Sequence, residues 1–465
     1  MEPNTLSAFE LARIQFAFTV CFHIVFPALS IGLANFIAVL EWRWLRTGKP
    51  HYKELCMYWS KFFAVAFGMG VVSGIVMAYE FGTAWAGFSK FAGPITGALL
   101  MYEVMTAFFL EAGFLGIMLF GWKRVTPRAH FTATVLVAIG TLISATWILA
   151  SNSWMQTPQG YAIADGHVVP VDWFKIIFNP SFPYRLVHMT LAAFIVAALV
   201  VGATGAWHLL KGRRDAAVKT TFSMALGILL VLAPIQAIVG DQHGLNTRKY
   251  QPAKIAAIEG LWETEKGGTA LNLFGIPDMK AETTHYAIQV PHLGSVILTH
   301  SWNGEIRGLK EFPPEDRPNS TIVFFSFRVM AGLGMLMILL GVLGLVLRRG
   351  GRLYEAKWFH RFALLMGPTG FISLLAGWVT TEVGRQPWVV YGVMRTSQAI
   401  SPLTVQQISL SLMTFVVVYL AVFGTGVYYL LKMARIGPGI THDPQDISTG
   451  HPRDTAGQRY SPLTR

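Results

Sequence analysis

Charged residues are scarce in this sequence. They make up 13% of its 465 residues, about half of the share in an ordinary soluble chain. A soluble protein of this size needs more polar surface to cover itself, so a water-soluble globular fold is excluded. Apolar residues reach 53%, which indicates that lipid is the solvent for much of the chain.

Cysteine is almost absent too. The two that are present, Cys21 and Cys56, lie in apolar or juxtamembrane sequence, which argues against a disulfide framework and against a cysteine-based metal site. Basic residues are in excess, with a net charge of +12, but they lie in short clusters between apolar runs. This pattern is typical of membrane topology, so nucleic acid is not an expected partner.

Nine apolar stretches are long enough to cross about 30 Å of hydrocarbon. The sequence therefore predicts an all-α helical bundle of about nine transmembrane helices in a lipid bilayer. The predicted spans lie near 15–40, 60–82, 95–120, 131–152, 186–210, 221–240, 322–347, 362–382 and 406–431.

The basic residues predict the orientation of these helices. The first, third, fifth and seventh connections contain sixteen lysines and arginines, whereas the second, fourth and eighth contain five. Connections rich in Lys and Arg stay in the cytoplasm, so the N-terminus and the long sixth connection are expected outside. An odd number of spans then places the C-terminus in the cytoplasm.

This topology divides the chain into four segments. Residues 1–240 are expected to hold six spans and residues 322–432 three more. Residues 241–321 form a long extracytoplasmic loop, and 433–465 form a polar cytoplasmic tail, rich in Gly and Pro, that is expected to be disordered. Within the loop, KIAAIEGLWETE (254–265) carries apolar residues at helical spacing. That spacing predicts a short amphipathic helix on the membrane surface.

A few ionisable side chains interrupt the apolar runs. Each costs roughly 2.5–3.5 kcal/mol at mid-membrane, so each needs a reason. With this orientation, five helices place candidate ligands in one outer layer of the membrane, with the first helix contributing the deepest. In chain order, these candidates are His23, Glu103, His188, Arg328, Met330 and Glu382.

Each of these candidate ligands could instead have a purely structural role. A histidine inside a membrane is often only a hydrogen-bonding partner, and methionine often fills gaps in a core. Glu103 and Glu111 are eight residues apart, about 12 Å along a helix, and could face one cavity or form the proton relay of a transporter. Glu382 and Arg385 could be an interfacial ion pair. The common depth is stronger evidence than any single residue.

Haem accounts for the set as a whole. A histidine nitrogen and a methionine sulfur are the axial pair of low-spin electron-transfer haem. Arg328, two residues before Met330, could neutralise a haem propionate. A histidine or carboxylate on a haem with an open face suits oxygen chemistry, and the remaining glutamates could deliver protons.

At these residues the sequence resembles subunit I of the cytochrome bd-type quinol oxidases. The resemblance covers nearly all of the transmembrane part, and its most specific motif is the one that contains GRQPW. The matching segments are ELARIQFAFTVCFHIVFPALSIG (10–32), MYEVMTAFFLEAGF (101–114), FNPSFPYRLVH (178–188), KIAAIEGLWETE (254–265), SFRVMAGLG (326–334) and GWVTTEVGRQPW (377–388).

The resemblance implies two haems beside the electron-entry haem. His188 and Met330 match the axial ligands of that entry haem, haem b558, with Arg328 next to it. His23 and Glu103 match residues of the haem d site, where oxygen is reduced.

Further matches imply the ligand of the third haem and a polar route for protons. Glu382 matches the ligand of haem b595, with Trp378 as an electron-transfer neighbour and Arg385 among the cofactor-binding residues. Glu111 resembles a proton-path or haem-support carboxylate, and Ser144 belongs to the same polar route.

The same resemblance implies the reaction. Lys254 and Glu259 match the quinol-binding pair of the outer "Q-loop". A carboxylate beside the quinol hydroxyl can act as general base. The implied enzyme is a quinol:oxygen oxidoreductase that oxidises ubiquinol or menaquinol outside and reduces O2 to water with cytoplasmic protons. Separating these steps generates a proton-motive force without a pump.

Further properties are implied by the family alone. Its members lie in the bacterial inner membrane with a large subunit II and a small single-helix subunit. The connection of about 80 residues between the sixth and seventh spans resembles the short-Q-loop forms. GRQPWVVYGVMRT resembles the cyanide-insensitive branch, in which a b-type haem stands in some members in place of haem d.

Two other functions remain open on the residues alone. A proton-coupled transporter could use Glu103, Glu111 and Glu382 as its relay, although the sequence shows no internal repeat. A membrane cytochrome that passes electrons to a protein partner would need His188 and Met330 but not the additional ligands. A visible absorption spectrum would separate all three.

Overall fold

The computed structural model describes residues 6–438 of the chain. Within this range nine helical segments are long and apolar enough to cross a membrane, one for each predicted span. The prediction of an all-α membrane bundle is confirmed. The segments are α1 (Ala8–Thr47), α2 (Pro50–Thr83), α3 with η1 and α4 (Ala86–Thr106, Ala107–Ala112 and Gly113–Phe120), α5 (Pro127–Gln156), α7 (Phe182–Leu210), α8 (Ala216–Tyr250), α11 (Ser320–Arg349), α12 with α13 (Lys357–Leu365 and Thr369–Val383) and α15 (Val405–Ile436).

Capping residues extend the helices beyond the apolar stretches. Ser7 and Glu10 form a reciprocal capping box at the start of α1, which satisfies two of the free N–H groups there. Gly48 ends α1 in the left-handed conformation, with a φ of 66°, where a glycine costs least. Pro50 then opens α2, so two long helices are joined by a two-residue turn.

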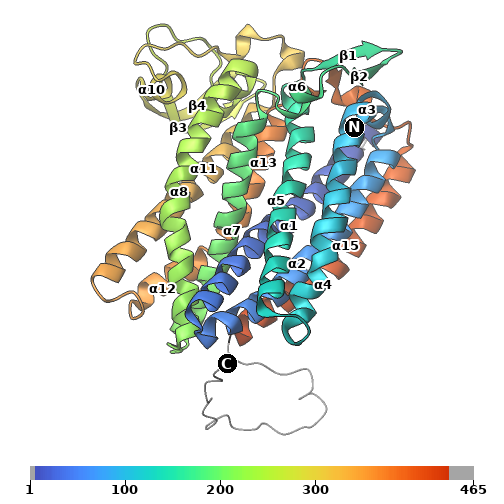
Figure 1. Cartoon of the computed structure of the whole chain (residues 1–465). Helices are drawn as coiled ribbons and strands as arrows, with labels where there is room; N and C mark the ends of the chain where they lie inside the picture. Colours follow the sequence, from blue (N-terminus) through green and yellow to red (C-terminus); the bar gives the residue numbers. More distant parts are fainter. Residues whose placement is uncertain (1–5, 439–465) are drawn as a thin grey trace, which may run out of the picture.

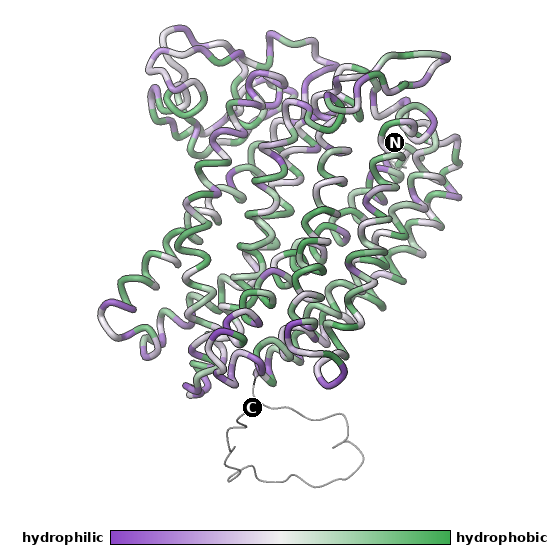
Figure 2. The backbone as a smooth tube through the Cα atoms, in the orientation of Figure 1, coloured by the Kyte–Doolittle hydropathy of each residue, from purple (hydrophilic) through white to green (hydrophobic). Residues whose placement is uncertain are grey.

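The helices run roughly side by side and alternate in direction (Figure 1). The start of α1 lies at the same end as the loop elements β3, β4 and α10, whereas α12 lies at the opposite end (Figure 1). Figure 2 shows apolar residues along the middle of the bundle and polar residues at its two ends. The end that carries the loop elements corresponds to the predicted outer face, and we call it the outer end.

The outer end is built from short elements between the spans. In the long connection after α8 these are α9 (Pro252–Glu259), α10 (Leu293–Thr299) and an antiparallel hairpin of β3 (Leu271–Asp278) and β4 (Thr283–Val290). α8 itself continues to Tyr250, so the connection begins later than the predicted 241. The remaining short elements of this end are β1 (Tyr161–Ala164), β2 (His167–Pro170), α6 (Trp173–Ile177), η3 (Leu309–Glu311), η4 (Pro314–Asp316), β5 (Trp388–Val390), β6 (Met394–Arg395) and α14 (Thr396–Ala399). The short element η2 (Gly121–Lys123) lies at the opposite end, between α4 and α5.

The helix predicted within 254–265 forms as α9, but its predicted amphipathic character, with one exposed face, is wrong. All residues from Ala253 to Glu259 are buried. Ile255 and Ile258 pack with Trp262, Leu309 and other apolar side chains of the loop and of α11. The apolar spacing therefore reports burial beneath the loop, because a helix covered on all sides needs no polar face.

The tail predicted for 433–465 begins later than expected. α15 continues through Met433 to Ile436, and residues 439–465 lie outside the described range.

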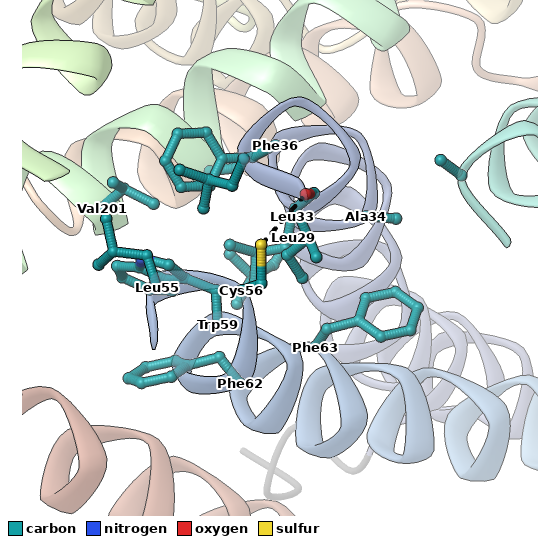
Figure 3. Close-up of a cluster of buried hydrophobic side chains, with 14 of the residues drawn as sticks. Leu29, Leu33, Ala34, Phe36, Leu55, Cys56, Trp59, Phe62, Phe63 and Val201 are labelled. Carbon is teal, nitrogen blue, oxygen red and sulfur yellow. Dashed lines mark hydrogen bonds between the residues drawn. The ribbon is translucent and has the colours of Figure 1, made fainter. Parts of the chain in front are cut away.

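Side chains of α1, α2 and α7 form the largest apolar cluster (Figure 3). Trp59 and Phe63 of α2 are fully buried against Leu33 of α1 and Val201 of α7. Cys56 lies in the same cluster, as Figure 3 shows. Its Sγ is 3.9 Å from the carbonyl oxygen of Ile37. Aromatic burial of this extent makes α1 and α2 a rigid pair.

A buried polar contact joins α1 to α5 at the opposite, inner end. His130 Nδ1 lies 2.6 Å from Glu41 Oε1, and the Thr134 hydroxyl donates to Glu41 Oε2 at 2.7 Å. Trp122 covers the imidazole, with ring centroids 3.9 Å apart. Because both partners are buried, this pair is sensitive to the loss of either one.

Candidate functional site

Glu382 is the centre of a buried polar cluster at the outer end. It lies in the last turn of α13 and accepts hydrogen bonds from Asn152 and Gln156 of α5, both at 3.2 Å. Arg385, one turn further along the chain, pairs with its other oxygen. The guanidinium of Arg185, from the first turns of α7, lies 3.8 Å away. Three helices therefore converge on one carboxylate.

Lys254 reaches the same cluster from α9. Its Nζ donates to Gln156 Oε1 at 2.8 Å, and the Gln156 amide in turn donates to Glu382. Burial lowers the pKa of Lys254 well below its usual range, an effect that Glu382 opposes and the two arginines reinforce. Burial also lowers the pKa of Arg385, with Glu382 opposing.

The cluster contains more positive charge than its protein partners neutralise. Among residues 6–438, the guanidinium groups of Arg185 and Arg385 face a single carboxylate, Glu382. Three guanidinium nitrogens are buried without a hydrogen-bond partner in this part of the chain. They are Nε of Arg185 and, in Arg385, Nε and one terminal nitrogen. Buried unpaired cations are costly. The site therefore suits a bound anionic group, and the carboxylates of haem propionates fit this requirement.

Arg328 and Glu259 form a second buried pair. Arg328 of α11 lies 3.2 Å from Glu259 Oε2 at the end of α9, and it also donates to the carbonyls of Ile258 and Asn272. Burial raises the pKa of Glu259, and Arg328 opposes this effect. Arg328 thus fastens the outer loop to a transmembrane helix.

The two residues of the predicted quinol-binding pair contact different parts of the bundle. Lys254 and Glu259 lie on one short helix, but the lysine turns to the Glu382 cluster and the glutamate to Arg328. The side chains of both residues are almost fully buried. They link the outer loop to two different parts of the bundle.

His188 and Met330 lie on α7 and α11, and both of these helices contact α13. His188 is one turn beyond Arg185, and its Nδ1 is buried without a partner in the described chain. The sulfur of Met330 faces Gly377 of α13, where a Cβ would lie 2.7 Å from it. Trp378 follows on the same helix. A free imidazole nitrogen and a thioether beside a residue without a side chain are donors that fit an axial haem pair.

His23 is oriented by the helix next to it. Its Nδ1 lies 3.0 Å from the hydroxyl oxygen of Ser73 on α2, and that hydroxyl donates to the carbonyl of Gly70 at 2.8 Å. The Ser73 oxygen therefore accepts the Nδ1 proton of His23. This leaves the other ring nitrogen, Nε2, as a lone-pair donor, the state that a metal ligand requires.

Glu103, Glu111 and Ser144 are brought together as predicted for one polar route. The Ser144 hydroxyl of α5 donates to Glu103 Oε1 at 2.8 Å. Glu111 lies in the π-helical segment η1 and packs on Gly140, one turn from Ser144. One of its oxygens is buried without a partner in residues 6–438. A π-helical turn is a common feature of functional sites.

Helix α5 connects the two carboxylate groups. Ser144 holds Glu103, and Asn152, eight residues later, holds Glu382. Eight residues correspond to about 12 Å along the helix axis. In the described residues no group of three His, Cys, Asp or Glu side chains could hold a metal ion. An iron held by these single side chains therefore needs further ligands, such as the four nitrogens of a porphyrin.

Several residues of the site were missed by the sequence reasoning. Arg185 belongs to a segment that matched the family and lies one residue before the predicted span 186–210, so it could have been found. Asn152, Gln156 and Gln251, which donates to Gln156, are neutral amides. A neutral amide gives no signal in the sequence that separates a cluster member from an ordinary polar residue.

Comparisons with known proteins agree on one family. The family model for "Cytochrome bd terminal oxidase subunit I" matches residues 11–438. Cytochrome bd ubiquinol oxidase subunit 1 of Bacillus subtilis (strain 168) is 34% identical, over 94% of this chain and 95% of that protein. Cytochrome bd-II ubiquinol oxidase subunit 1 of Escherichia coli (strain K12) is 30% identical, over 94% and 98%.

The fold leads to the same family. The solved bd oxidase from Geobacillus thermodenitrificans superposes with a TM-score of 0.86 at 29% sequence identity, covering 94% of this chain and 100% of that one. Residues 11–438, which the family model matches, include every residue of the site. This multi-pass membrane chain therefore belongs to the cytochrome bd terminal oxidase subunit I family.

Proposed function

We propose that this chain is the haem-bearing catalytic subunit of an oxidase that oxidises quinol at the outer face and reduces O2 to water with cytoplasmic protons. The observation that carries the proposal is the excess of buried cationic groups around Glu382, with unpartnered guanidinium nitrogens in the described chain. Family membership sets aside the transporter and the non-oxidase cytochrome.

The proposed haem ligands are residues with a free donor atom. Haem, when bound, supplies iron that transfers single electrons and, with an open axial position, reduces O2. His188 and Met330 would hold the electron-entry haem, haem b558. His23 and Glu103 would hold the haem of the oxygen site, which is haem d or a further b-type haem. Glu382 would hold haem b595. Which macrocycle occupies the oxygen site is not encoded by axial ligands.

Arg185 and Arg385 would bind propionates in this arrangement. Arg385 has two buried nitrogens without partners in residues 6–438, whereas the guanidinium of Arg328 already donates to Glu259 and to backbone carbonyls. We therefore propose Arg328 chiefly as a support for the loop. We propose Trp378, which follows Gly377 on α13, as an electron-transfer neighbour of the haems.

The segment between α8 and α11 is proposed as the quinol-binding loop. Glu259 would take the quinol hydroxyl proton. Its raised pKa brings it closer to the range in which a general base is efficient. Lys254 would orient the headgroup, and its contact with Gln156 connects it to the Glu382 cluster.

Protons for oxygen reduction are proposed to pass through Glu111 and Ser144 to Glu103. The support is their contact across η1, α3 and α5. Uptake from the cytoplasm and release outside would generate a proton-motive force without pumping. We further propose the bacterial inner membrane as the location, with a subunit II and a small single-helix subunit as partners.

Absorption spectroscopy of the purified protein tests the proposal. Oxidised and dithionite-reduced spectra should show haem, and quinol should drive oxygen consumption in an oxygen electrode. His188→Ala should remove the low-spin haem, whereas His167→Ala in the exposed hairpin β1–β2 should leave it unchanged. A purified chain without a Soret band would refute the proposal.

A further inference from the structure

The side of α8 that faces His188 carries three polar or small residues at helical spacing. Gln236, Gly240 and His243 follow one another at intervals of four and three residues, so they share one face of the helix. Each of them approaches His188 in the structure. None of the three was a candidate from the sequence.

Gly240 shows which edge of the imidazole faces α8. A Cβ at this position would lie 3.4 Å from Cε1 of His188 and 3.9 Å from Nδ1. The Cε1–Nδ1 edge of the ring therefore faces Gly240 on α8, and Nε2 is not among the atoms within 4 Å of that position. A ligand bound through Nε2 would leave an Nδ1–H group directed at the turn of α8 that contains residues 236–240.

Gln236 offers an acceptor at this turn. Its Nε2 donates to the backbone carbonyl of His188 at 3.1 Å. A carbonyl oxygen can only accept a hydrogen bond, so the group of Gln236 that faces it must be the NH2 group. The amide oxygen of Gln236, Oε1, therefore points elsewhere and remains free to accept a hydrogen bond. Oε1 of Gln236 is buried without a partner in the described residues, and so is Nδ1 of His188.

These two unpartnered atoms complement each other. Leaving a buried donor and a buried acceptor unpaired costs roughly 1–3 kcal/mol each. Histidines that ligate metals almost always donate their second ring N–H to an acceptor, which sets the tautomer and raises the basicity of the ligand. His23 has such an acceptor in Ser73, whereas His188 has none in residues 6–438.

We infer that Gln236 becomes the positioning residue of His188 when haem binds: its Oε1 then accepts the Nδ1 proton while its Nε2 keeps its contact with the His188 carbonyl. This inference rests on the proposed role of His188 as a haem ligand. Gln236 thereby selects the Nδ1–H tautomer, directs Nε2 to the iron and makes the imidazole a stronger donor. A stronger donor favours the oxidised haem, so Gln236 lowers the potential of the low-spin haem.

The test is a redox titration of the low-spin haem in the purified holoenzyme. Gln236→Leu removes the acceptor and should raise the midpoint potential, and Gln236→Glu supplies a stronger acceptor and should lower it. The expected change is about five- to tenfold in the ratio of reduced to oxidised haem at a fixed ambient potential. A tenfold change corresponds to about 59 mV for one electron.

Two further variants separate this role from a structural one. Gln242→Leu makes the same substitution at an exposed position of α8 and should leave the potential unchanged. His243→Phe keeps a ring beside His188, whose centroid lies 5.7 Å from that of His243, and it should also leave the potential unchanged. The electron paramagnetic resonance g values of the ferric low-spin haem should shift only in the Gln236 variants.

The outcomes are distinguishable. Potentials and g values that are unchanged in both Gln236 variants would overturn the inference, as would a shift in His243→Phe alone. If His188→Ala retained the low-spin haem, the proposed ligand itself would be wrong, and the inference would fall with it. Because Gln236→Glu nearly preserves side-chain volume, it keeps the test valid if Gln236→Leu does not fold.

Discussion

Gly377→Ala is expected to displace the sulfur of Met330 and thereby to change the low-spin haem. A Cβ at position 377 would lie 2.7 Å from Met330 Sδ, and ordinary contacts begin at 3.4 Å. The sulfur must therefore move by about 0.7 Å or more, or α13 must move away from α11. Overpacking of this kind typically costs about 1–3 kcal/mol, so the protein should fold but lose thermal stability.

The spectrum is the decisive measurement. If Met330 is an axial ligand, a shift of this size weakens the iron–sulfur bond. The reduced low-spin band should then fall or shift, and the exposed iron should bind carbon monoxide. Gly332→Ala on α11 is the matched control, because a Cβ there meets nothing within 4 Å. A Gly377→Ala protein with an unchanged low-spin band and no added carbon monoxide binding would refute the assignment of Met330.

Three other predictions concern the ligand, the base and the inner end. Met330→Leu nearly keeps the side-chain volume and should remove or shift the low-spin haem while preserving the fold; an unchanged reduced spectrum would contradict this. Glu259→Gln should slow quinol oxidation at constant haem content. Since a base must be deprotonated and the pKa of Glu259 is raised above its ordinary value, the wild-type rate should fall as the pH drops through that raised pKa. The variant should lack this acidic limb, and an identical pH profile would exclude Glu259 as the base. Glu41→Ala leaves His130 buried without its 2.6 Å partner and should cost about 3–5 kcal/mol of stability. Thermal unfolding checks it, with Glu311→Ala in an exposed pair as the control that should not change the unfolding temperature.

The helices and most of the site residues could be predicted because their signals are local. Each span needs about 20 apolar residues in a row, and an ionisable residue within such a run is visible without a structure. That is why His23, Glu103, Glu111 and Glu382 were found. The position of α9 was predicted as well, but its burial was not, since the covering loop comes from residues far away in the sequence.

The sequence by itself determined the number of spans, their alternation and the family, since hydropathy, basic clusters and motifs are properties of short segments. Only the tertiary structure decided the partners. It assigned Lys254 to Gln156 and the Glu382 cluster, and Glu259 to Arg328. It also placed Gln236 against His188, a pairing across 48 residues. Such contacts depend on how helices rotate and pack against one another, and a neutral amide carries no local signal of the atom it will face.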